Sequence, residues 1–178
     1  GTGASTEPAA QDAPATAADA ASEASFADLS KRWLDGWLKL NPVNATQQGD
    51  HRFDAEIDDL SAAGRARYVD FSRKMLAELD AIDATRLSRE NQIDAAILRN
   101  QIQSDIWGMD TLQAWAWDPQ VYGGLAGSAI YNLMAREFAP LPERLKSATV
   151  RMEKLPTLFA QMRQNIDPAR VPRTHAET

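Results

Sequence analysis

The residues best suited to binding or chemistry lie close together in a polar, turn-rich stretch between Pro42 and Asp59. His51, Arg52 and Asp54 place an imidazole, a guanidinium and a carboxylate within four positions. Binding groups tend to lie on loops that a rigid scaffold holds in place, so these three residues are our candidates for substrate contact in a cleft. The alternative is a solvated loop whose histidine and aspartates bond to the local backbone.

Histidine spacing excludes the common zinc and di-iron helix motifs from this sequence. The two histidines, His51 and His175, are too far apart for an H-E-x-x-H helix. Gln48 and Pro172 stand three positions before them, so the Glu-x-x-His pattern of di-iron bundles is absent as well. His175 and Glu177 could supply two ligands, which is half a metal site. We therefore predict no catalytic residue and no metal-binding residue in this segment.

Other chemical signals are also missing. There is no cysteine, which excludes disulfides and thiolate metal sites. The glycines match no phosphate-binding pattern and no G-x-S-x-G elbow marks a nucleophile, although a Ser-His-Asp arrangement stays open. A net charge of −6 argues against a nucleic-acid partner. No run of 18 apolar residues predicts a transmembrane segment.

The element that should organise these residues is a long helix over about Ser88–Leu112, whose helical wheel carries two apolar stripes. One stripe consists of Ala95, Leu98, Ile102, Ile106 and Met109. The other consists of Ile93, Ala96, Ile97 and Trp107, together with Asn100 and Ser104. A surface helix needs only one apolar stripe, so we predict a central helix with neighbours on both sides and a buried, hydrogen-bonded Asn100.

Two further helices should flank this central helix. A capping box at Ser25 to Asp28 predicts the start of the first, which carries Phe26, Leu29, Trp33 and Trp37 inward. The second spans Ser61 to Ile82, with inward positions at Tyr68, Phe71, Met75, Leu79 and Ile82. Its short connection to the central helix predicts an antiparallel pair.

The later chain shows weaker periodicity. We expect an aromatic, glycine-bearing loop from Thr111 to Gly127 and a short helix from Ser128 to Phe138 that turns Ile130, Leu133 and Met134 inward. A helix beginning near Pro142 should bury Leu145, Ala148, Met152 and Leu155, and Pro156 either kinks it or begins another. Together these elements predict an all-α fold, a multi-helix array around the central helix.

The two ends of the chain suggest its organisation. Residues 1–24 contain no large apolar side chain, which predicts a disordered tether of the kind that follows a secretory signal or a lipid anchor. The closing ARVPRTHAET has no apolar periodicity. We therefore expect residues 25–178 to be the helical part of a larger, truncated domain.

Several runs in the chain resemble one protein family. They are NPVNATQQGDHRFDAEIDDLS, LSRENQIDAAILRNQI, WAWDPQVY, AREFAPLPERLKSATVRMEKLP and VPRTHAET. In this order and spacing they are similar to the N-terminal part of the bacterial domain-of-unknown-function family 885. The resemblance implies a secreted, periplasmic or lipid-anchored protein that is a largely helical zincin-type metallopeptidase.

The family's His-Glu-x-x-Pro-Gly-His-type motif belongs to a later part of the chain, so the resemblance implies zinc in the full-length parent and none in this segment. These helices would then form one wall or lid of a substrate cleft. Their partners would be the remainder of the parent chain and a peptide substrate. The alternatives are a non-enzymatic module that binds a peptide or partner helix, and a lipid-tethered structural protein of the envelope.

Overall fold

The computed structural model describes residues 18–177, and every regular element in this range is helical, which confirms the all-α prediction. The α-helices are α1 (Ala20–Leu40), α2 (Pro42–Gln47), α3 (Ala62–Asp80), α4 (Arg89–Trp107), α5 (Ala114–Trp117), α6 (Gln120–Met134), α7 (Leu141–Asn165) and α8 (Arg173–Ala176). Short 3₁₀ turns lie at His51–Phe53, Ala84–Arg86 and Pro168–Arg170, and a π-helical turn, Gly108–Leu112, extends α4.

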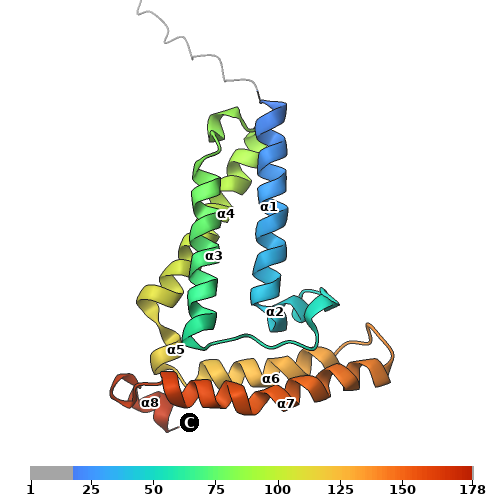
Figure 1. Ribbon diagram of the computed structural model, residues 1–178, viewed down its shortest axis with the longest axis vertical. Helices are drawn as coiled ribbons and strands as arrows, with labels where there is room; N and C mark the ends of the chain where they lie inside the picture. The colour runs from blue at the N-terminus through green and yellow to red at the C-terminus, as the bar shows by residue number, and fades with distance from the viewer. Residues whose placement is uncertain (1–17, 178) are drawn as a thin grey trace, which may run out of the picture.

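These helices form two groups. Figure 1 shows α1, α3 and α4 standing side by side as a bundle, with α6 and α7 lying across its lower end. The segment from α2 to the start of α3 runs between the two groups. The groups also meet directly, since Arg65 of α3 donates to Asn165 Oδ1 of α7 at 2.9 Å.

The first helix begins earlier than predicted. Asp19 is its N-cap and accepts from the Ala21 N–H at 3.0 Å. Glu23, inside the first turns, accepts from the Ser88 backbone N–H and the Asn91 side chain at the start of α4. The predicted capping box at Ser25 is therefore wrong, and residues 20–24 of the expected tether are helical because α4 supplies donors to them. Residues 1–17 lie outside the described residues.

The three upright helices share one apolar core. Its buried members are Phe26, Leu29, Met75, Leu79, Leu87, Ala95, Leu98 and Ile102. Ser61 caps α3 by accepting from the Gly64 N–H, and Ser88 caps α4 by accepting from the Asn91 N–H, at the residues where the two predicted helices begin. The apolar spacing thus determines which helix faces form the core, and the serine caps determine where α3 and α4 begin.

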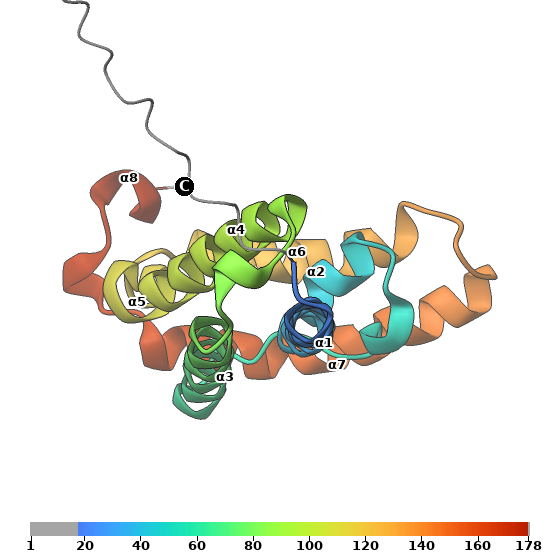
Figure 2. The same ribbon diagram turned by 90° about the horizontal axis from the view of Figure 1, so that it is seen from above.

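Only one of the two stripes predicted for α4 is buried. Ala95, Leu98 and Ile102 face α1 and α3, but Ile93, Ile97 and Trp107 are 48%, 63% and 53% exposed. Ala96, Asn100 and Ser104 are exposed as well. The prediction of neighbours on both sides, and of a buried Asn100, is wrong for the described residues. The reason is that α1 and α3 both pack on the same side of α4 (Figure 2).

The lower group contains more helix than predicted. Residues 114–117 and 120–127 are helical, although their glycines indicated a loop. In α6 the buried face is formed by Tyr122, Ala126, Ala129 and Leu133. Gly123, Gly124 and Gly127 lie on its exposed side. Tertiary packing of the apolar face therefore outweighs the low helix propensity of glycine.

Helix α7 is rotated relative to the prediction. It is continuous from Leu141 to Asn165 through Pro156, so no second helix begins there. Leu145 and Met152, predicted to face inward, are each 48% exposed. The buried positions are Arg144, Ala148, Arg151 and Leu158. Two arginines thus occupy the inward face.

Candidate functional site

The polar stretch between the two helix groups is built as a chain of short capped turns. Asn41 precedes α2, and Gly49, with φ +90°, lets the backbone reverse after it. Asp50 then caps the turn His51–Phe53 by accepting from the Arg52 N–H at 3.1 Å. The turn at Gly49 and the cap at Asp50 hold the candidate residues at defined positions near the base of the bundle.

Arg151 anchors this stretch from below. Its side chain is 0% exposed and extends from α7. It donates to four carbonyls and one hydroxyl: Glu56 O at 2.8 Å, Ala129 O at 2.9 Å, Pro42 O at 3.1 Å, Phe53 O at 3.3 Å and Thr46 Oγ1 at 2.7 Å. Burial lowers the pKa of Arg151, and the nearby carboxylates of Asp54, Asp58 and Glu56 oppose that effect. The loop is therefore wrapped around a buried cation.

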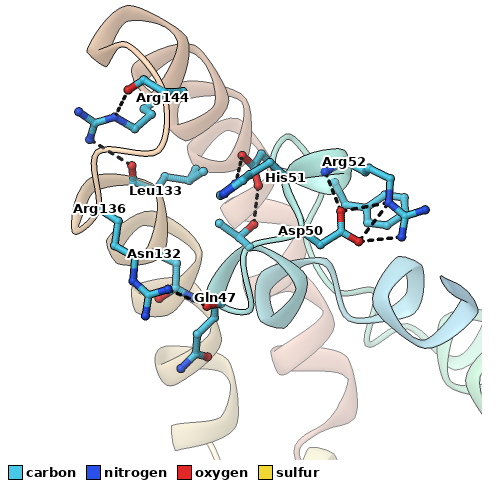
Figure 3. A network of polar contacts seen from close by, with 12 residues as sticks. Gln47, Asp50, His51, Arg52, Asn132, Leu133, Arg136 and Arg144 are labelled. Carbon is cyan, nitrogen blue, oxygen red and sulfur yellow. Dashed lines mark hydrogen bonds and ion pairs between the residues drawn. The ribbon is translucent and has the colours of Figure 1, made fainter. Parts of the chain in front are cut away.

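His51 and Asp54 join this network. His51 Nδ1 lies 2.9 Å from Asp54 Oδ2, and the His51 ring stacks on Phe138 with 3.6 Å between centroids. Thr46 donates to Asp54 Oδ1 at 2.7 Å and accepts from Arg151. A continuous polar chain therefore runs from the buried guanidinium of Arg151 to the imidazole of His51. Figure 3 shows the His51 end of this chain.

A shallow pocket of about 300 Å³ opens beside His51 and Asp54. Glu143, Arg144 and Ser147 of α7 also line it. Arg144 bonds the end of the α6–α7 connection, donating to Ala139 O at 2.9 Å and to Leu133 O at 3.4 Å. The structure thus places a histidine, an aspartate and a serine around one pocket.

Arg52 points the other way. Figure 3 shows it on the side of the turn opposite to His51, beside Asp50. It contacts Asp50 Oδ2 at 2.7 Å and Asp35 Oδ1 of α1 at 3.1 Å. The carboxylates raise its pKa, Asp50 more than Asp35. The three predicted residues therefore serve two sites: His51 and Asp54 face one pocket, and Arg52 borders another.

The second site is a groove of about 860 Å³ between α1, α3 and the stretch from Arg52 to Leu60. Its apolar lining includes Leu40, Phe53, Ile57, Leu60, Phe71 and Met109. Its charged lining includes Lys39, Arg52, Glu56, Asp58, Asp59, Arg67 and Asp70. The groove combines an apolar surface with charges of both signs.

One carboxylate of the groove has an unusual environment. Burial raises the pKa of Asp58 to about 6, against the opposing effects of the Val43 N–H and Arg151. Asp58 Oδ1 accepts from the Val43 N–H at 3.2 Å and so caps α2 from fifteen residues away. This residue connects the groove to the helix that positions it.

Tyr68 lines the groove and has buried polar groups as neighbours. Burial raises the pKa of Tyr68, and the neighbouring Asp105 carboxylate raises it further. Burial also raises the pKa of Asp105. Within the described chain, Asp105 Oδ2 and the indole N–H groups of Trp33 and Trp37 are buried and lack a hydrogen bond of standard geometry. The upper end of the groove thus borders polar groups at the centre of the bundle.

The remaining histidine is elsewhere. His175 Nδ1 lies 3.0 Å from Asp118 Oδ1 and beside Trp117, while Glu177 pairs with Arg173. Across residues 18–177, no three His, Cys, Asp or Glu side chains are grouped so that they could hold a metal ion. In the same range, no helix is long and apolar enough to cross a bilayer.

Sequence reasoning missed Arg151 and Thr46. One signal was present, since Arg144, Ala148, Arg151, Leu155 and Leu158 follow a 4,3,4,3 spacing. An arginine at the centre of such a stripe indicates a buried cation that needs several acceptors.

The chain belongs to a family of bacterial proteins of unknown function, DUF885, whose match spans residues 42–178. It is also similar to a solved structure from Shewanella oneidensis described as "a putative lipoprotein of unknown function". The two are 31% identical, with a TM-score of 0.74, over 80% of this chain and 26% of that one. This chain thus spans about a quarter of the solved protein's length. No curated protein matches it.

Proposed function

We propose that this helical unit is the scaffold of a larger secreted, periplasmic or lipid-anchored zinc metallopeptidase, and forms one wall of its substrate cleft. The groove of about 860 Å³ carries this proposal. Its apolar lining suits side chains of an extended peptide, and its charged rim suits polar ends. The family resemblance of the sequence motifs, which implies a zincin-type peptidase, supports the same proposal.

The zinc itself does not fit the described residues, because they offer no group of three ligands. A zinc centre and its general base would have to come from polypeptide outside the described range. The contribution of this chain is shape and positioning. The turn capped by Asp50 and the buried Arg151 hold the groove wall rigid, and a rigid wall orients a bound peptide at little entropic cost.

A comparison of metal content and peptide hydrolysis tests the enzymatic part. We expect the full-length relative from Shewanella oneidensis to bind about one zinc and to hydrolyse peptides, and we expect this 178-residue chain to do neither. Equal activity in both proteins would place the chemistry in the helical unit. No metal and no hydrolysis in the longer protein would refute the peptidase assignment.

A second candidate is a non-enzymatic module that binds a peptide. One observation favours it: the described residues form the whole groove without another chain. Titration of this chain with unstructured peptides, followed by tryptophan fluorescence, separates the candidates. An independent module would bind in the micromolar range, whereas one wall of a cleft would bind a thousandfold more weakly.

Either kind of binding should depend on the groove. Arg52→Ala should weaken peptide binding severalfold, because it removes the cation at the rim. Arg99→Ala is the matched control, since Arg99 is also an exposed, ion-paired arginine but lies on α4 away from the groove. Equal effects of the two substitutions would show that the peptide binds elsewhere.

A further inference from the structure

The exposed side of α4 carries a regular pattern. Five residues follow a 4,3,4,3 spacing and form what we call the outer seam: Ile93, Ile97, Asn100, Ser104 and Trp107. This spacing places them on one stripe with the period of left-handed helix packing. Three of them are large apolar side chains that are 48% to 63% exposed. A solvated helix face has no physical reason to carry this pattern.

The seam is separate from the sites described above. It lies on the side of α4 opposite to Ala95, Leu98 and Ile102, which pack against α1 and α3. The groove lies on the other side of the bundle, between α1 and α3. Figure 2 shows α4 at the edge of the molecule, with α3 and α1 on one side of it. A partner on the seam would leave the groove open.

The chemistry of the seam indicates a helix as its partner. Ile93, Ile97 and Trp107 would interdigitate with an apolar ridge, and a polar Asn100 at the centre would fix the register through a hydrogen bond. Along one edge lie Glu90 and Asp94, which form no ion pair within residues 18–177. The partner helix should therefore carry apolar residues at heptad spacing and Lys or Arg along the facing edge.

The size of the seam favours a partner in the same polypeptide. Stable interfaces between separate proteins use about 20–30 residues a side. Five side chains of one helix are far fewer. A helix joined through its own chain needs less contact area, because its effective concentration is high. The solved relative has such polypeptide, since the match covers only 26% of its length.

We infer that the outer seam of α4 is the docking surface for an amphipathic helix from the part of the longer fold that lies outside this chain. This inference rests on one part of the proposed function, namely that the unit belongs to a larger fold. It does not depend on peptidase activity.

Thiol labelling tests the inference, because this chain has no cysteine. Ile97→Cys places a unique thiol in the seam, and Lys74→Cys places one on the exposed surface of α3 as the control. In this 178-residue chain a maleimide should modify both rapidly. In the full-length solved relative, a cysteine at the position superposing on Ile97 should react at least tenfold more slowly. The position superposing on Lys74 should react as before.

Equal, fast labelling of both positions in the longer protein would overturn the inference. If the Ile97 variant does not fold there, a cysteine at the position superposing on Asn100 provides the same measurement. Sedimentation equilibrium of this chain tests the other occupant. A dimer that Ile97→Asp dissociates would assign the seam to a second copy and also overturn the inference. Protection of the seam without zinc or hydrolysis would sustain it and refute only the peptidase assignment.

Discussion

The two helix groups of this molecule are held together in different ways. The bundle of α1, α3 and α4 closes around large apolar side chains, such as Leu29, Met75 and Ile102. The lower group also has an apolar core, formed by Leu60, Tyr122, Ala126 and Leu158, but it differs in enclosing the buried guanidinium of Arg151, which bonds to the segment from α2 to α3. Apolar packing tolerates small changes of shape, whereas a buried cation requires all its acceptors in place. One side of the groove is therefore formed by helices that pack through apolar side chains, and the other side is held by a network of polar contacts.

The largest effect should come from removing the cation. Arg151→Met should destabilise the protein by about 3–5 kcal/mol, because it leaves buried carbonyls and nearby carboxylates without their partner. Urea unfolding followed by circular dichroism measures the loss. Arg163→Met is the control on the same helix and should change stability by less than about 0.5 kcal/mol, since Arg163 is exposed. A small effect of Arg151→Met would show that the network contributes little.

Two neighbouring residues of α4 test how much apolar packing stabilises the bundle of α1, α3 and α4. Leu98→Ala should cost about 2–4 kcal/mol, because Leu98 is buried in the core of the bundle. Ile97→Ala, one position earlier, should cost less than about 1 kcal/mol because its side chain is 63% exposed. The same urea titration measures both. Equal losses would mean that the outer seam is covered in solution.

This contrast also explains how far the sequence could predict the fold. The bundle was predictable, because each of its helices carries apolar residues at helical spacing, among them Leu29, Met75 and Leu98, and because α3 and α4 begin beside Ser61 and Ser88, where the predicted helices start. Periodicity shows which faces are apolar. It does not show whether the described chain covers them, and so the prediction for Ile97 and Asn100 was wrong.

The candidate site was less predictable. His51 and Asp54 lie three positions apart, and their contact follows from local geometry. The separation of Arg52 from them could not be inferred, because Arg52 pairs with Asp50 beside it and with Asp35 of α1, and its sequence neighbours do not indicate which partners it takes. The Arg151 network joins residues about a hundred positions apart in sequence, and the groove joins residues between Gly36 and Met109. Periodicity could place Arg151 on an inward face of α7, but it could not identify the acceptors that Arg151 contacts there.

A pH titration probes the point where the two groups meet. The folded-state pKa of Asp58 is about 6, above its ordinary value of about 3.9. The folded protein therefore holds this proton more tightly than the unfolded chain. The resulting stabilisation is fully present below pH 4 and is lost as the pH rises through 6.

Asp58→Asn keeps an oxygen for the Val43 N–H but cannot ionise. The stability of this variant relative to the unsubstituted chain should therefore increase by on the order of 2 kcal/mol between pH 4 and pH 7. Taking the difference between the two proteins cancels the titration of all other groups. A difference that does not change with pH would show that Asp58 titrates near its ordinary value.

The smallest effects come from a pair of glycines, one at the junction and one on the open face of α6. A Cβ at Gly64 would overlap the backbone oxygen and the carboxylate of Asp59, whereas a Cβ at Gly127 would meet nothing within 4 Å. Gly64→Ala should therefore cost about 1–2 kcal/mol through displacement of the loop. Gly127→Ala should add about 0.5–1 kcal/mol, because alanine loses less backbone entropy in a helix. Thermal unfolding should move the two midpoints in opposite directions. If Gly127→Ala also lowered the midpoint, the open face of α6 would already be in contact with another surface in solution. The measurement thus distinguishes Gly64, where a side chain does not fit, from Gly127, where a side chain fits.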